Sequence, residues 1–214
     1  MTGRAGGDPT LEGIRALGHR ITGLPLSRME LTLCRAVRAR HLARVPPEPL
    51  YHHGSAAYGA RYTPLGGPAG LYLASDQPTA YAELQHLFCD AAGRPLPLRP
   101  EDPVLTVYVE ARLSGVLDLT EQRVRRALGV TRAGITGEWR PAMERYLAGL
   151  APMPLTQQIG HAAHATTRVR GIRFPSARWK GGMCVVVFPD RLVGREGDRV
   201  EAVDTAGTYA QHIP

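Results

Sequence analysis

The stretch Leu71-Tyr-Leu-Ala-Ser-Asp-Gln-Pro-Thr-Ala-Tyr-Ala-Glu-Leu-Gln-His-Leu-Phe88 joins two kinds of secondary structure. Residues 71–74 have the composition of a short strand, and Ser75-Asp76-Gln77-Pro78 supplies the cap and first turn of a helix reaching about Phe88. The apolar stripe of this helix consists of Ala80, Leu84, Leu87 and Phe88. Glu83 falls on the shoulder of that stripe, which predicts a partly desolvated carboxylate.

Outward from this stretch, strands and helices are mixed without a strand-helix-strand rhythm. We expect helices over 9–24, 118–128, 141–147 and 155–167, strands over 31–37, 104–109, 172–174 and 183–188, and a hairpin over 191–203 turning at 194–198. The pattern predicts an α+β fold with a mixed or antiparallel central sheet flanked by helices. Residues 1–30 are expected to form an N-terminal helical extension and residues 31–214 the functional domain.

The composition is that of one globular domain, with 214 residues, 43% hydrophobic and 21% charged. The longest dense apolar run, Met183 to Phe188, is only a strand's length, so we expect no membrane span. The N-terminus lacks the apolar core of a secretory signal, and the three cysteines, Cys34, Cys89 and Cys184, cannot all pair within the chain. These features favour a cytoplasmic protein.

The formal net charge is +7, which makes a non-enzymatic, basic nucleic-acid-binding module one hypothesis. Every basic residue except Lys180 is an arginine, and the arginines are scattered over all segments without a recognisable nucleic-acid-binding motif. The excess of arginine over lysine is explained more simply by a coding preference than by a selected basic patch. Single arginines remain candidates for gripping an anionic small molecule.

Metal and thiol chemistry receive little support. The adjacent pair His52-His53 and the helical pair His161 and His164 offer too few ligands for zinc, so we assign no metal. No cysteine has a histidine and asparagine partner set, and glycine-rich phosphate loops are absent.

A more informative series is Gly59-Ala60-Arg61-Tyr62, Leu71-Tyr72-Leu73-Ala74 and Ala80-Tyr81-Ala82-Glu83, in which Arg61, Tyr72 and Glu83 are evenly spaced. The segments Leu33-Cys34-Arg35-Ala36, Leu155-Thr156-Gln157 and Pro175-Ser176-Ala177-Arg178 accompany it. In this order the motifs resemble those of the RES domain, the toxin half of many bacterial toxin–antitoxin pairs, over about residues 31–192.

The resemblance implies a fold similar to ADP-ribosyltransferases and a toxin that depletes NAD by cleaving its nicotinamide–ribose bond, through hydrolysis or phosphorolysis. It implies Glu83, Arg61 and Tyr72 as catalytic residues. It also implies an NAD-binding set, which comprises Arg35, Arg61, Tyr62, Tyr72, Gln157 and Ser176. A carboxylate beside the ribose suits a cationic, oxocarbenium-like transition state.

The resemblance further implies an Xre-like antitoxin as partner, with nucleic acid contacted only through it, and a homodimer as one possible assembly. Transfer of ADP-ribose to a macromolecular acceptor shares the first half-reaction and is the enzymatic alternative. Two departures stand out in the arginine motif: Ala60 replaces a glycine of the family pattern and Tyr62 a tryptophan.

Overall fold

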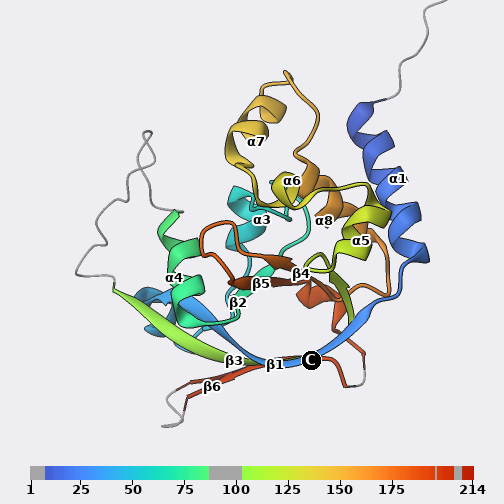
Figure 1. Ribbon diagram of the computed structural model, residues 1–214. Coiled ribbons are helices and arrows are strands. Elements are labelled where there is room, and N and C mark those ends of the chain that lie inside the picture. The colour runs from blue at the N-terminus through green and yellow to red at the C-terminus, as the bar shows by residue number, and fades with distance from the viewer. Residues whose placement is uncertain (1–7, 87–102, 196, 205–208) are drawn as a thin grey trace, which may run out of the picture.

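The centre of the molecule is a closed β-barrel, seen in the computed structural model, which describes residues 8–86, 103–195, 197–204 and 209–214 (Figure 1). Its strands follow the order β1 (Ser27–Arg38), β2 (Leu71–Ala74), β5 (Met183–Val187), β4 (Gly171–Pro175) and β3 (Val104–Asp118), and pairing of β1 with β3 closes the ring. On the outside of β3, β6 (Arg199–Val203) and β7 (Ala210–Ile213) continue the sheet. The pairing of β3 with β4 is parallel and the other pairings are antiparallel. The expected mixed sheet is confirmed, although the sequence did not indicate its closure.

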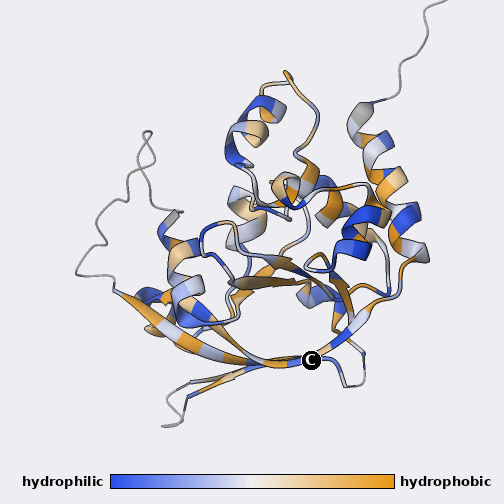
Figure 2. Ribbon diagram, in the orientation of Figure 1, coloured by the Kyte–Doolittle hydropathy of each residue, from blue (hydrophilic) through white to orange (hydrophobic). Residues whose placement is uncertain are grey.

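Helices gather on one side of the barrel (Figure 1). They are α1 (Pro9–Gly23), α2 (Ala39–Leu42), α3 (Gly54–Tyr58), α4 (Gln77–His86), α5 (Gln122–Leu128), α6 (Arg132–Thr136), α7 (Arg140–Leu147), α8 (Leu155–Ala165) and a single 3-10 turn, η1 (Pro189–Arg191). Side chains of α1, α5 and α8 bury one apolar core against β4 and β5. A second core fills the barrel interior and includes Val185 and Val187, so both faces of β5 are buried. Figure 2 shows these strands as largely hydrophobic and α5 as largely hydrophilic.

Strand β3 shows why the chain forms a barrel. Val107, Val109, Ala111 and Leu113 are buried, while the residues between them are exposed. This alternation places every second side chain in the barrel interior. At Ser114–Gly115 the register with β1 shifts, and the buried pair Arg170–Asp198 holds the irregular segment, because Asp198 accepts hydrogen bonds from the Ser114 amide and hydroxyl.

The first helix is a well-capped part of the structure. Asp8 accepts a hydrogen bond from the Thr10 amide at 2.9 Å, and Leu17 and Ile21 are buried in the core that α1 shares with α8. The chain then enters β1 at Ser27, so β1 runs across the expected boundary between residues 30 and 31.

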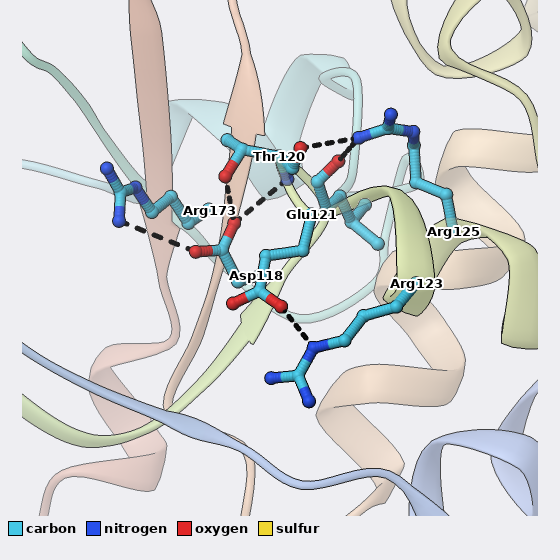
Figure 3. Close-up of polar contacts among 7 residues, drawn as sticks. Asp118, Thr120, Glu121, Arg123, Arg125 and Arg173 are labelled. Atoms are coloured by element: carbon cyan, nitrogen blue, oxygen red, sulfur yellow. Dashed lines mark hydrogen bonds and ion pairs between the residues drawn. The ribbon is translucent and has the colours of Figure 1, made fainter.

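Two expected elements differ from the structure. The described residues 191–195 and 197–198 contain no strand, and β6 pairs instead with β3 and β7, so the hairpin expected over 191–203 is wrong. The helix expected from Asp118 begins at Gln122. Asp118 instead ends β3, accepting hydrogen bonds from the Thr120 amide and hydroxyl and pairing with Arg173 at 3.4 Å (Figure 3). The carboxylate therefore stabilises a turn before the helix.

Candidate functional site

The carboxylate of Glu83 is tied to the segment that follows β4. Its Oε1 accepts a hydrogen bond from the Ser176 hydroxyl at 2.6 Å and another from the Ala177 amide at 3.0 Å. No hydrogen bond to Oε2 is seen among the described residues. Glu83 is partly buried and Ser176 is buried. One oxygen thus fixes the carboxylate, and no described residue forms a hydrogen bond to the other.

Ser176 organises the turn around this contact. Its hydroxyl oxygen accepts hydrogen bonds from the amides of Arg178 at 3.1 Å and Trp179 at 3.0 Å while donating to Glu83. A serine side chain that caps a turn in this way is an ordinary local motif. Here the same oxygen also orients the candidate catalytic carboxylate.

Glu83 lies on α4, and hydrogen bonds at the start of this helix fix where the helix begins. Asp76 accepts hydrogen bonds from the Thr79 amide at 2.8 Å and from the Ser75 hydroxyl at 2.6 Å. The Ser75 hydrogen bond is the main cause of a lowered pKa for Asp76. Gly182 allows the fully buried Thr79 to approach β5, because a Cβ on Gly182 would lie 2.3 Å from the Thr79 hydroxyl. The cap predicted from the sequence is confirmed.

Tyr72 supports the loop that carries Arg61. Its hydroxyl accepts a hydrogen bond from the Tyr62 amide at 2.9 Å and lies 3.2 Å from the Thr63 hydroxyl. Burial raises the pKa of Tyr72 to about 12, so the phenol is neutral at physiological pH. The observed role of Tyr72 is to hold this loop, and its contact with a substrate stays a prediction.

Arg61 is buried and its guanidinium faces backbone oxygens. Its Nη1 donates hydrogen bonds to the carbonyls of Ile135 at 3.1 Å and Gly137 at 2.8 Å. No carboxylate pairs with it among the described residues. Buried charges are normally matched by an opposite charge, so this cation is suited to an anionic ligand.

Tyr62 and Gln157, two members of the expected NAD-binding set, lie in the interior of the protein, and their binding role stays a prediction. Both are fully buried; the Tyr62 ring packs on Phe174 with centroids 4.6 Å apart, and Gln157 Nε2 donates to the Ala60 carbonyl at 3.0 Å. Among the described residues, the Tyr62 hydroxyl and Gln157 Oε1 have no hydrogen-bond partner. In this structure these two residues support the arginine loop.

Cys184 lies on β5 close to the same groups. Burial is the main reason that the pKa of its thiol is raised, with the negative charge of Glu83 adding to the effect. A thiol that keeps its proton is a poor nucleophile. Cys184 is therefore a poor candidate for a nucleophile.

Arg35 is set apart from this cluster. Arg35 shares its face of β1 with Leu33 and Val37, which belong to the barrel core, whereas Tyr72 and Cys184 belong to the helix-side core. Its guanidinium donates to the carbonyl of Pro49 at 2.7 Å and to that of Tyr51. Glu83, Ser176, Arg61 and Tyr72 thus form the candidate site, and the binding role expected of Arg35 stays a prediction.

Some contacts that shape the site have no clear signal in the sequence. Gly160 of α8 touches the Tyr62 backbone, and a Cβ there would lie 1.7 Å from the Tyr62 carbonyl oxygen. Glu138 pairs with Arg178 at 2.6 Å. Only the glycine within a predicted helix hinted at a close approach.

Other kinds of site find little in the described part of the chain. No cluster of three or more metal-ligating side chains occurs there. No helix among those residues is long and apolar enough to cross a membrane. A cavity of about 400 Å³ opens beside Arg28, Arg112, Ser114 and Asp198, but its lining includes none of the predicted site residues.

Comparison with known proteins assigns the chain to a family. Residues 32–208 match the model of the RES domain, and the chain belongs to this family. Among solved structures it is similar to the toxin–antitoxin complex MbcT–MbcA of M. tuberculosis, with a TM-score of 0.64 and 23% identity, covering 92% of this chain and 91% of that chain. At this identity the likeness establishes the fold. No curated protein matches the chain significantly.

Proposed function

We propose that this protein is an NAD-consuming toxin that cleaves the bond between nicotinamide and ribose. The observation that carries the proposal is the anchored carboxylate of Glu83, with Oε1 held by Ser176 and Ala177. A carboxylate held in place beforehand stabilises developing positive charge without having to reorganise during the reaction. Membership of the RES family and likeness to a toxin–antitoxin complex support the biological role.

In the proposed reaction the C1′–N1 bond of NAD breaks and its electron pair stays on the nicotinamide nitrogen. Nicotinamide leaves as a neutral molecule, so no group needs to protonate it. The Glu83 carboxylate stabilises the oxocarbenium-like ribose while Arg61 binds the negatively charged diphosphate. Water or phosphate then attacks C1′. With water, the attacking oxygen loses a proton to Glu83 and the product is ADP-ribose.

The acceptor defines the precise activity. Purified protein is incubated with NAD labelled in its adenosine part, with and without inorganic phosphate and with cell lysate, and the labelled product is separated by chromatography. Label on ADP-ribose indicates hydrolysis, and label on its phosphorylated form indicates phosphorolysis. Label on a macromolecule would instead establish the alternative, an ADP-ribosyltransferase. Absence of nicotinamide release from folded protein under all these conditions would contradict the proposal.

An antitoxin is the proposed partner, in analogy to the complex named for the similar structure. We expect an Xre-like protein that blocks access to Glu83, and NAD as the small-molecule partner. Co-expression tests this proposal: the neighbouring antitoxin gene should restore growth and cellular NAD, and growth arrest that persists despite a stable complex would contradict it.

Direct nucleic-acid binding is disfavoured by how the arginines are used. Arg20 donates to the Leu128 carbonyl at 2.7 Å, and Arg168 to the Thr22 carbonyl at 2.7 Å. Arg125 binds the carbonyls of Leu119 and Thr120 (Figure 3). These arginine side chains therefore stabilise the fold by donating hydrogen bonds to backbone carbonyls. Binding to DNA or RNA at low salt, where phosphate-driven affinity is greatest, is expected to be weak.

A further inference from the structure

The segment Ile135–Glu138 comprises the end of α6 and the first residues of its connection to α7. It contacts two arginines, Arg61 and Arg178. Two of its carbonyls, of Ile135 and Gly137, accept hydrogen bonds from Arg61 at 3.1 and 2.8 Å. The carboxylate of Glu138 pairs with Arg178 at 2.6 Å. We call residues 135–138 the strap.

Arg178 is linked directly to the Glu83 contact. Arg178 follows Ser176 by two residues, and its amide donates to the Ser176 hydroxyl at 3.1 Å. Arg61 is held by the Ile135 and Gly137 carbonyls of the strap. Because Gly137 and Glu138 are consecutive, the two guanidinium groups hold neighbouring points of one short segment.

The strap presents the kind of surface that a diphosphate would present. Two carbonyl oxygens and a carboxylate together offer several acceptors and negative charge to a pair of guanidinium groups, which are the preferred partners of phosphate oxygens. The strap itself is accessible at its charged end, since the Glu138 side chain is 53% exposed and that of Arg178 is 22% exposed. A contact of this exposure is weak enough to be exchanged for a charged ligand.

We propose that the strap is an internal competitor of the substrate: it occupies Arg61 and Arg178 in the free protein, and the diphosphate of a dinucleotide displaces it on binding. This inference rests on the proposed function for the identity of the ligand. It assigns Arg178 as a second diphosphate-binding residue beside Arg61. It also makes the α6–α7 segment move when the site fills.

The test measures binding of ADP-ribose, which carries the diphosphate and has no nicotinamide to lose, by calorimetry. Glu138→Gln removes the competing carboxylate, so its Kd is expected to fall about two- to five-fold, the range for one partly exposed ion pair. Glu144→Gln is the matched control: it makes the same change of charge at an exposed residue of α7 and is expected to leave Kd unchanged. In wild type, ADP-ribose is expected to speed hydrogen exchange in residues 131–147.

The proposal is overturned by a Kd for Glu138→Gln that is equal to or larger than that of wild type, by an equal fall in Glu144→Gln, or by slower exchange in residues 131–147. It is also overturned if ADP-ribose binds none of the variants. Nicotinamide release is measured in parallel. ADP-ribose binding without nicotinamide release by any variant would contradict the proposed function while still testing the strap.

Discussion

The Ser176 hydroxyl donates a 2.6 Å hydrogen bond to Glu83 Oε1 and thereby joins α4 to the turn after β4. The two residues are 93 positions apart in the chain, and the barrel strands bring them together. A helix capped by Asp76 and a turn capped by Ser176 each fix one partner. The candidate catalytic carboxylate is therefore oriented by two independent local structures.

Removal of the Ser176 hydroxyl should impair activity in a protein that still folds. In Ser176→Ala the carboxylate keeps only the Ala177 amide on Oε1, and the amides of Arg178 and Trp179 lose their acceptor. We expect kcat for nicotinamide release to fall roughly 10- to 100-fold, since misplaced catalytic groups cost about this much. The free energy of unfolding should fall by only about 1–3 kcal/mol. Full kcat in a folded variant would show that Ser176 does not position Glu83.

A methyl group at Gly160 should disturb the arginine loop. The Cβ in Gly160→Ala would lie 1.7 Å from the Tyr62 carbonyl oxygen, which is backbone and must move. We expect a loss of about 1–3 kcal/mol in the free energy of unfolding. Gly18→Ala in α1 is the control, because no atom lies within 4 Å of its Cβ; it should gain up to about 1 kcal/mol from helix propensity. Denaturant unfolding of both variants measures the difference, and equal effects would argue against the close contact.

The buried pair Arg170–Asp198 should be a major determinant of stability. Their side chains are 9% and 3% exposed and the Nε to Oδ2 distance is 2.9 Å. Asp198→Asn leaves a buried arginine without its counter-charge, so we expect a loss of about 3–5 kcal/mol in the free energy of unfolding. Glu48→Gln, in the exposed pair Arg44–Glu48, should cost less than about 1 kcal/mol. Similar losses in both variants would contradict this assignment.

The cap at Asp76 predicts a dependence of stability on pH. Hydrogen bonds from Ser75 and Thr79 lower the pKa of Asp76 in the folded protein, so the ionised cap contributes stability above the unfolded pKa of about 3.9 and loses it as pH falls through the lower folded value. Asp76→Ala should therefore lower Tm relative to wild type at pH 7. The difference between the two should shrink below about pH 4. A difference that is constant between pH 7 and pH 3 would show that the charge of Asp76 is not involved.

Elements that depend on neighbouring residues are predicted well from the sequence, whereas pairings between distant strands are not. The cap at Ser75-Asp76, the helix that carries Glu83 and the strand of Tyr72 depend on neighbours in the chain, and the structure confirms them. Closure of the barrel depends on the register of β1 with β3, which no short pattern records. The hairpin expected over 191–203 failed because β6 finds its partners in β3 and β7.

Short motifs likewise predict individual residues of the candidate site but not the distant contacts between them. Motifs identified Glu83, Arg61, Tyr72 and Ser176, which the fold brings to one region. Arg35 shares its face of β1 with two core residues, and alternation alone does not tell which face of a strand meets the site. The partners of Arg61 lie 74 and 76 residues further along the chain, beyond the reach of any local pattern.

Cleavage of NAD by Glu83 is tested most directly by nicotinamide release from NAD, followed by chromatography for wild type and Glu83→Gln. Glu83→Gln keeps an oxygen for the Ser176 hydroxyl but removes the negative charge. We predict release by wild type and a loss of at least about 100-fold in the variant, with an unchanged Tm, because one preorganised electrostatic group is worth this much. Equal release by a folded Glu83→Gln protein would contradict a catalytic role of Glu83.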